Sequence, residues 1–153
     1  MTDYATISTE TWKARLPTDW SERGSATKHT VYFESTDGAM GAYFSTWCFN
    51  DDPRSMGEIL RSFHRVEAEA LHAMKDRAWQ SIDAWSSDTA GLGVLGTDFL
   101  DRQNHYRIAC HIIARMPWVV RSAFHHYDCT DYEESKRFFQ PIIESLHIHH
   151  EET

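Results

Sequence analysis

The chain has 153 residues, of which 41% are hydrophobic and 25% are charged, and its formal net charge is −8. This composition is typical of one globular domain with its own core, which excludes an intrinsically disordered protein. The acidic balance argues against a nucleic-acid-binding protein, because such proteins need a basic excess to neutralise phosphates.

Short β-strands are predicted in the first third of the chain, around one strong turn signal. The pair Asp37-Gly38 is typical of a β-hairpin turn. The strand after this turn is apolar at both odd and even positions, which indicates a strand that is covered on both faces. The strands predicted in this region span residues 5–8, 12–16, 27–36 and 39–49.

A long amphipathic helix is predicted over residues 55–75. Ser55-x-x-Glu58 has the pattern of a capping box, and Pro53 lies near the first turn. Apolar residues then recur at steps of three and four, with charged residues on the other side. The apolar positions are Met56, Ile59, Leu60, Phe63, Val66, Ala70, Leu71 and Met74.

From residue 78 the hydrophobic period changes to two, which predicts a run of strands. Turn-forming residues separate these strands, including Ser86-Ser87-Asp88 and Pro117. Short connections between successive strands imply antiparallel neighbours. The four predicted strands span residues 79–85, 92–100, 105–116 and 118–127.

A second helix is predicted over residues 131–146, followed by a tail over 147–153. Thr130-x-x-Glu133 indicates its N-terminal cap, and Pro141 should kink or restart it. The element order predicts a single α+β domain over residues 1–146, with an antiparallel sheet of five to seven strands and helices that cover it. The expected core includes Leu60, Phe63, Ile108, Cys110, Ile112, Phe139 and Ile143.

The cysteines and the N-terminus predict a cytoplasmic protein with no membrane partner. Cys48, Cys110 and Cys129 are odd in number and share no C-x-x-C spacing, so we expect reduced and mostly buried thiols. The first residues have neither the basic nor the apolar region of a signal peptide. No uncharged run approaches the roughly 18 residues that a transmembrane helix needs.

Two short motifs and the order of the elements resemble a known fold. Leu16-Pro17-Thr18-Asp19-Trp20 resembles the L-P-x-x-W of domains with the PsbP/Mog-like fold. The closing segment 138–146 is similar to the helix that ends those domains, and the element order matches over nearly the whole chain. The resemblance implies a scaffold for binding proteins, whose bacterial members include chaperones and other accessories of secreted toxic effectors, as in type VI secretion.

Patterns that would indicate catalysis or a cofactor are weak. The ten histidines include His125-His126, but consecutive residues of a strand point to opposite faces and do not easily share one ion. Residues 91–96 match G-x-G-x-x-G, yet the segment alternates as a strand, so a closely packed glycine-rich strand is the better interpretation. We therefore predict no catalytic residue, no cofactor and no metal site.

A basic face on the predicted strand 105–116 is the best candidate for a binding site. The even-numbered positions of this strand are apolar, and the odd-numbered positions carry histidine and arginine side chains. This face is either a docking surface for a protein or a solvated surface with local ion pairs, and the strand register decides which residues of 118–127 join it. The candidate partner-binding residues are His105, Arg107, His111, Arg115, Arg121 and His125.

These observations favour a non-enzymatic protein-binding module, and two classes of function remain open. Within the first, the resemblance and the acidity suggest an immunity protein or a chaperone for a secreted bacterial toxin or effector. The second class is a small-molecule or metal-binding domain, possibly an enzyme with a pocket between the sheet and the long helix.

Overall fold

The structure is a computed structural model that describes residues 2–25 and 27–149. Two helices and ten strands follow one another in the described chain, and they confirm the predicted α+β class. In chain order the elements are β1 (Tyr4–Ser8), β2 (Trp12–Pro17), β3 (Ser21–Arg23), β4 (Thr30–Glu34), β5 (Met40–Cys48), α1 (Met56–His72), β6 (Gln80–Thr89), β7 (Leu92–Asp101), β8 (Tyr106–Arg115), β9 (Trp118–His126), α2 (Tyr132–Ser145) and β10 (His147–Ile148).

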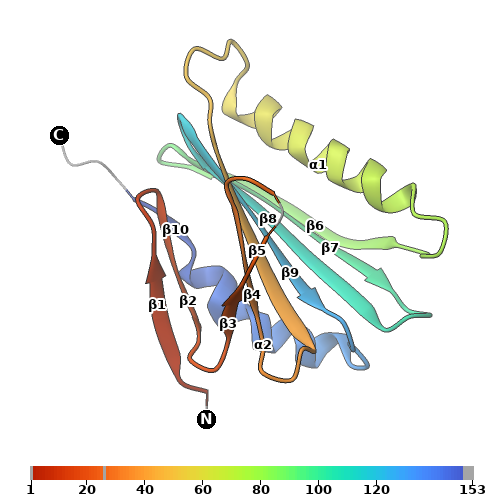
Figure 1. Ribbon diagram of the computed structural model, residues 1–153. Helices are drawn as coiled ribbons and strands as arrows, with labels where there is room; N and C mark the ends of the chain where they lie inside the picture. The colour runs from red at the N-terminus through yellow and green to blue at the C-terminus, as the bar shows by residue number, and fades with distance from the viewer. Residues whose placement is uncertain (1, 26, 150–153) are drawn as a thin grey trace.

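Two antiparallel sheets organise the strands (Figure 1). The large sheet has seven strands in the order β3-β4-β5-β9-β8-β7-β6, so the segment 80–126 forms the predicted meander. The small sheet has the order β1-β2-β10 and joins the two ends of the chain. None of the helices within the described residues is long and apolar enough to cross a membrane.

The turn between β6 and β7 lies further along the chain than predicted. Residues Ser86 to Asp88 belong to β6, which runs to Thr89. The turn is made by Ala90 and Gly91, whose φ angles are 54° and 80°. Successive positive φ angles are those of the tight hairpin turns that match the twist of the strands, so this geometry, and not the polar run before it, ends the strand.

Helix α1 packs on β7 and β8, on one face of the large sheet (Figure 1). Ser55 caps the helix as predicted, since its Oγ accepts a hydrogen bond of 3.2 Å from the Glu58 backbone N–H. The glycine-rich segment is a strand that approaches the helix closely. A Cβ atom on Gly93 would lie 2.8 Å from Met56 Cε and 2.9 Å from Leu60 Cδ1. This close packing against the helix explains why position 93 is a glycine.

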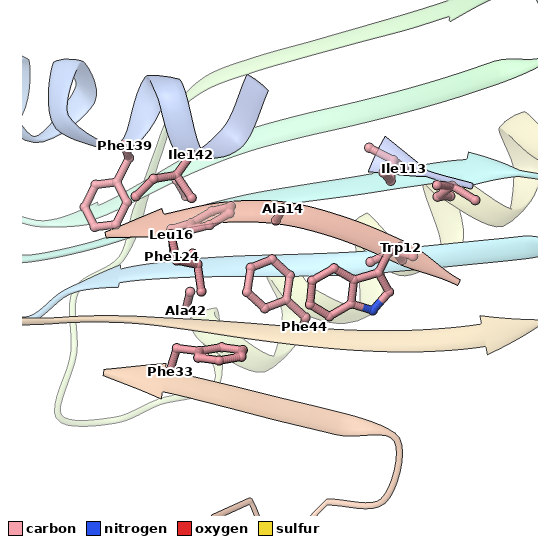
Figure 2. Close-up of a cluster of buried hydrophobic side chains, with 13 residues drawn as sticks. Trp12, Ala14, Leu16, Phe33, Ala42, Phe44, Ile113, Phe124, Phe139 and Ile142 are labelled. Atoms are coloured by element: carbon pink, nitrogen blue, oxygen red, sulfur yellow. The ribbon is translucent and has the colours of Figure 1, made fainter. Parts of the chain in front are cut away.

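Helix α2 and strand β2 cover the opposite face of the large sheet and bury the main core. Figure 2 shows aromatic side chains of this cluster, in which the rings of Trp12 and Phe44 stack with centroids 4.5 Å apart. Asp131, one residue beyond the predicted position, caps α2. The helix does not restart at Pro141, which lies inside it, and the neighbouring Phe139 and Ile142 are fully buried.

The C-terminal segment after residue 146 is partly structural, which corrects the predicted tail. His147 and Ile148 form β10 and pair with Lys13 and Trp12 of β2. The Ile148 side chain is only 1% exposed and belongs to the main core. Two residues are too few to show a strand period, and their partner strand lies more than 130 positions away. Residues 150–153 of the predicted tail lie outside the described residues.

The predicted core is confirmed for five of its seven members and needs correction for two. Leu60, Ile108, Cys110, Ile112 and Phe139 are buried. Phe63 and Ile143 are half-buried, because each lies beside a cavity. Of the three free cysteines, Cys110 and Cys129 are buried as expected, whereas Cys48 at the end of β5 is exposed.

Candidate binding cleft

A cleft of about 740 Å³ lies between α1 and the sheet. It forms because α1 packs on β7 and β8, while β5 and β9 continue the sheet beyond the helix. The walls are mostly apolar and come from the inner side of α1, from β5 and from the segments that flank the helix. The principal apolar residues are Trp47, Phe49, Phe63, Val66, Leu71 and Met74.

The apolar walls of this cleft reach the solvent. Val66 is 59% exposed, Met74 is 44% exposed and Trp47 is 38% exposed. The rings of Trp47 and Phe63 meet edge to face, with centroids 4.8 Å apart, and form one end of the cleft. Because large exposed apolar side chains that lie together mark binding surfaces, the cleft is the leading candidate for the functional site.

The floor of the cleft contains a partly buried ion pair. Arg121 of β9 donates through Nε to Glu67 Oε1 at 2.9 Å, and its Nη2 contacts the same oxygen. The Cys110 thiol also donates to Glu67 Oε1 at 2.9 Å. Burial, and then the charge of Glu67, raise the pKa of Cys110, so the thiol stays protonated. The carboxylate of Glu67 is thus fixed at the centre of the cleft.

A neutral hydrogen-bonded pair lies beside this ion pair. The Tyr106 hydroxyl and Nδ1 of His125 are 2.6 Å apart. Burial, followed by the charge of Arg121, lowers the pKa of His125 to about 3, so the imidazole is uncharged near neutral pH. Burial raises the pKa of Tyr106, which keeps the hydroxyl protonated as the donor. These groups make the cleft polar at one point without adding a net charge.

The six candidate residues from the sequence do not form one exposed face. Arg107 pairs with His126 across β8 and β9, and His111 pairs with Ser122, so Arg121 and His125 point to the other side of the sheet. This register places Arg121 and His125 in the cleft under α1. Arg107 and His111 instead lie under α2, in a second cavity.

Burial also corrects the expected exposure of this basic face. Arg107 is buried, and it donates to Asp98 Oδ1 at 2.7 Å and to Ser135 Oγ at 3.0 Å. His105 lies exposed in the turn before β8, and Arg115 at the end of β8 is half-buried. Helix α2 covers the middle of this sheet face, because the apolar side of the helix packs against it. The role of these six residues in partner binding remains a prediction.

Within the described residues, no group of three or more His, Cys, Asp or Glu side chains is placed to hold a metal ion. His125 and His126 lie on opposite faces, as their positions on one strand predicted. His125 contacts Tyr106 under α1, whereas His126 Nδ1 lies 2.9 Å from Ser135 Oγ of α2.

The sequence placed a pocket between the sheet and the long helix only as the alternative function, and it did not identify the residues that line the cleft, although one signal pointed to them. The apolar stripe of the first helix includes Val66, Ala70 and Met74, at steps of four residues. The face that α1 buries against the sheet is narrower and contains Ile59, Leu60, Glu67 and Leu71. A stripe wider than the buried face indicates a second apolar surface on the same helix.

Comparison with known proteins identifies the fold. No protein-family model and no curated protein sequence matches the chain. A solved structure does: the solution structure of cyanobacterial PsbP (CyanoP) from Synechocystis sp. PCC 6803 is similar with a TM-score of 0.71. The similarity covers 97% of this chain and 94% of that chain at 13% sequence identity. The chain has a PsbP-like fold.

The similarity supports the fold that the resemblance implied, and it does not show the role as an accessory of secreted effectors. At this level of identity the comparison shows the fold alone, and a fold hosts many functions. The function of this PsbP-like chain therefore has to be argued from its own cleft.

Proposed function

We propose that the chain is a non-enzymatic, cytoplasmic binding module of the chaperone type, which holds an apolar helical segment of a secreted bacterial effector in the cleft under α1. The observation that carries this proposal is the cleft itself, with its exposed rim of Trp47, Val66 and Met74. Leaving such side chains exposed is unfavourable unless a partner covers them.

The shape of the cleft favours a helix as its occupant. On α1 the lining extends from Ser62 to Leu71, which corresponds to about 14 Å along the helix axis, and Met74 continues it just past the helix end. Helical segments bind in apolar grooves through side chains spaced at three and four residues. Methionine and aromatic side chains adapt well to such faces. The exposed rim leaves the groove accessible from solvent, as a chain longer than the groove requires.

An immunity protein, the other role that the resemblance suggests, would block a toxin with its surface charge. The net charge of −8 suits a basic partner. That role needs no open apolar cleft, so the cleft favours the chaperone. A small apolar ligand is the second candidate, because the volume of about 740 Å³ lies within the range of small-molecule sites.

Peptide binding tests the proposal. The probe is a fluorescent, lysine-flanked helical peptide of leucine and alanine, titrated by anisotropy. Val66→Glu and Met74→Glu place a charge on the apolar rim, and each should weaken binding at least tenfold, or about 1.4 kcal/mol. Met116→Glu is the matched control, because Met116 has similar exposure, lies in the turn between β8 and β9 and does not line the cleft.

Equal affinity of the cleft variants and the Met116→Glu control would show that the peptide binds elsewhere and would overturn the proposal. Native mass spectrometry distinguishes the second candidate, a small apolar ligand, from a bound peptide. A small molecule of constant mass that leaves the protein only on unfolding, and that the peptide fails to displace, would favour a small-ligand site over a chaperone groove.

A further inference from the structure

A second cavity lies on the other side of the sheet, under α2. Its volume is about 380 Å³, within the range of small-molecule sites. The β6–β8 part of the sheet forms one wall, and α2 with the segment that follows it forms the other. Leu92, Val94, Ile113 and Ile143 make its apolar lining. The cavity shares no lining residue with the cleft under α1.

His111 lines this cavity without a protein partner for its imidazole. The residue is only 8% exposed. Within the described part of the chain its ring nitrogens take part in no hydrogen bond, and only its backbone carbonyl accepts one, from Ser122 Oγ. Burial lowers the pKa of His111 to about 4, so the ring is neutral and offers one donor and one acceptor. Neither ring nitrogen is among the fully buried atoms without a partner in the described residues, so the polar edge of the ring stays accessible from the cavity.

Trp85 of the edge strand β6 provides a flat wall beside His111. Its ring lies 5.6 Å from the His111 ring, centroid to centroid, and the residue is 47% exposed. Gly96 makes this approach possible. A Cβ atom at this position would lie 2.6 Å from Trp85 Nε1 and 2.9 Å from His111 Cε1. Glycine in the middle of a strand is unfavourable unless something approaches it closely, and here both rings do.

The charges around the cavity disfavour an anionic ligand. Arg107 is bound to Asp98 at 2.7 Å, and Lys136 lies 3.8 Å from Asp83 near the rim. Glu144 is the third carboxylate of the lining and accepts a hydrogen bond from Gln140 at 2.7 Å. Two cations against three carboxylates leave a net charge of −1 among these five lining residues. A neutral ligand therefore fits better than a phosphate or a carboxylate.

We propose that this cavity binds a neutral aromatic molecule that carries a hydroxyl or ring N–H group, of the phenol or indole class. Its ring packs on Trp85 and against the aliphatic side chains, and its polar group hydrogen-bonds the imidazole of His111. An offset ring contact and one hydrogen bond together give both the affinity and the selectivity for a polar aromatic ring. The site is independent of the proposed chaperone cleft on the opposite face.

A titration of ¹⁵N-labelled protein with phenol, indole and toluene tests this site by NMR. Phenol and indole should shift the indole N–H of Trp85 and the amide of Gly96 in a saturable way. His111→Phe should weaken phenol binding at least tenfold and leave the weaker binding of toluene unchanged, because toluene forms no hydrogen bond with the imidazole.

Trp85→Ala tests the ring contact with a variant that should fold, since Trp85 is exposed on an edge strand. It should weaken all three ligands, whereas the matched control Trp118→Ala, at an exposed position of β9 outside this cavity, should weaken none. Three results would overturn the proposal: the absence of saturable shifts, shifts that map to the cleft under α1, or phenol binding to His111→Phe with unchanged affinity.

Discussion

At the scale of single residues, the structure depends on charges that the chain neutralises internally. Glu67 is almost fully buried on the inner side of α1. Its Oε1 atom accepts hydrogen bonds from both Arg121 and the Cys110 thiol. The other carboxylate oxygen, Oε2, is buried without a hydrogen-bond partner in the described residues. Such an arrangement is sensitive to the loss of either partner, because desolvation leaves a lone buried charge without compensation.

We predict that Arg121→Ala lowers the free energy of unfolding by about 3 kcal/mol at neutral pH, because it leaves the Glu67 carboxylate buried and unpaired. Replacing both partners, as Glu67→Leu with Arg121→Leu, should cost less than about 1 kcal/mol, since no charge then remains. Urea unfolding of the three proteins measures both values. A double variant less stable than the single one would contradict this account.

At the scale of elements, the sequence predicts those with a clear period and misses those that depend on distant contacts. The periods of α1 and of β7 to β9 placed these elements within a few residues. β10 has only two residues and is held by β2, so no local pattern could show it. The same limit applies to the cleft. The exposed stripe of Val66 and Met74 was visible, but the position of α1 over β7 and β8 depends on tertiary packing.

β10 should contribute strongly to stability despite its length. We predict that Ile148→Ala lowers the free energy of unfolding by about 2–5 kcal/mol, because the side chain is buried in the core formed by β2, α2 and the large sheet. Ile82→Ala on the exposed edge strand β6 is the control and should cost less than about 1 kcal/mol. Denaturant melts measure the difference, and equal losses would mean that the C-terminal segment does not dock.

At the scale of the whole molecule, both faces of the large sheet are covered and each carries a cavity lined by a histidine. His125 lies in the cleft under α1, and His111 lies in the cavity under α2. The meander β7-β8-β9 separates the two sites, so a single sheet supports both. Four of the six basic candidates are therefore divided between two sites on opposite faces of the sheet, whereas the sequence analysis placed them on one face of strand 105–116.

This division predicts how the stability of the whole domain depends on pH. The pKa is lowered to about 4 for His111 and to about 3 for His125, mainly by burial, whereas an unfolded histidine titrates near 6.5. Between these values the unfolded chain binds more protons than the folded one, so the free energy of unfolding falls as the pH falls. The loss begins near pH 6.5, and for His111 it approaches roughly 3 kcal/mol by pH 4.

Urea unfolding at pH 7.0 and pH 5.0 measures this effect, and Asp37 and Asp52, whose pKa values are lowered, titrate below that window. His111→Phe and His125→Phe should each reduce the difference in unfolding free energy between the two pH values, and the double variant should reduce it further, while His126, whose pKa is also lowered by burial, keeps a remainder. His72→Gln changes an exposed histidine at the end of α1 and should leave the difference unchanged. An unreduced pH dependence in the double variant His111→Phe/His125→Phe would show that other groups control the acid stability of the domain.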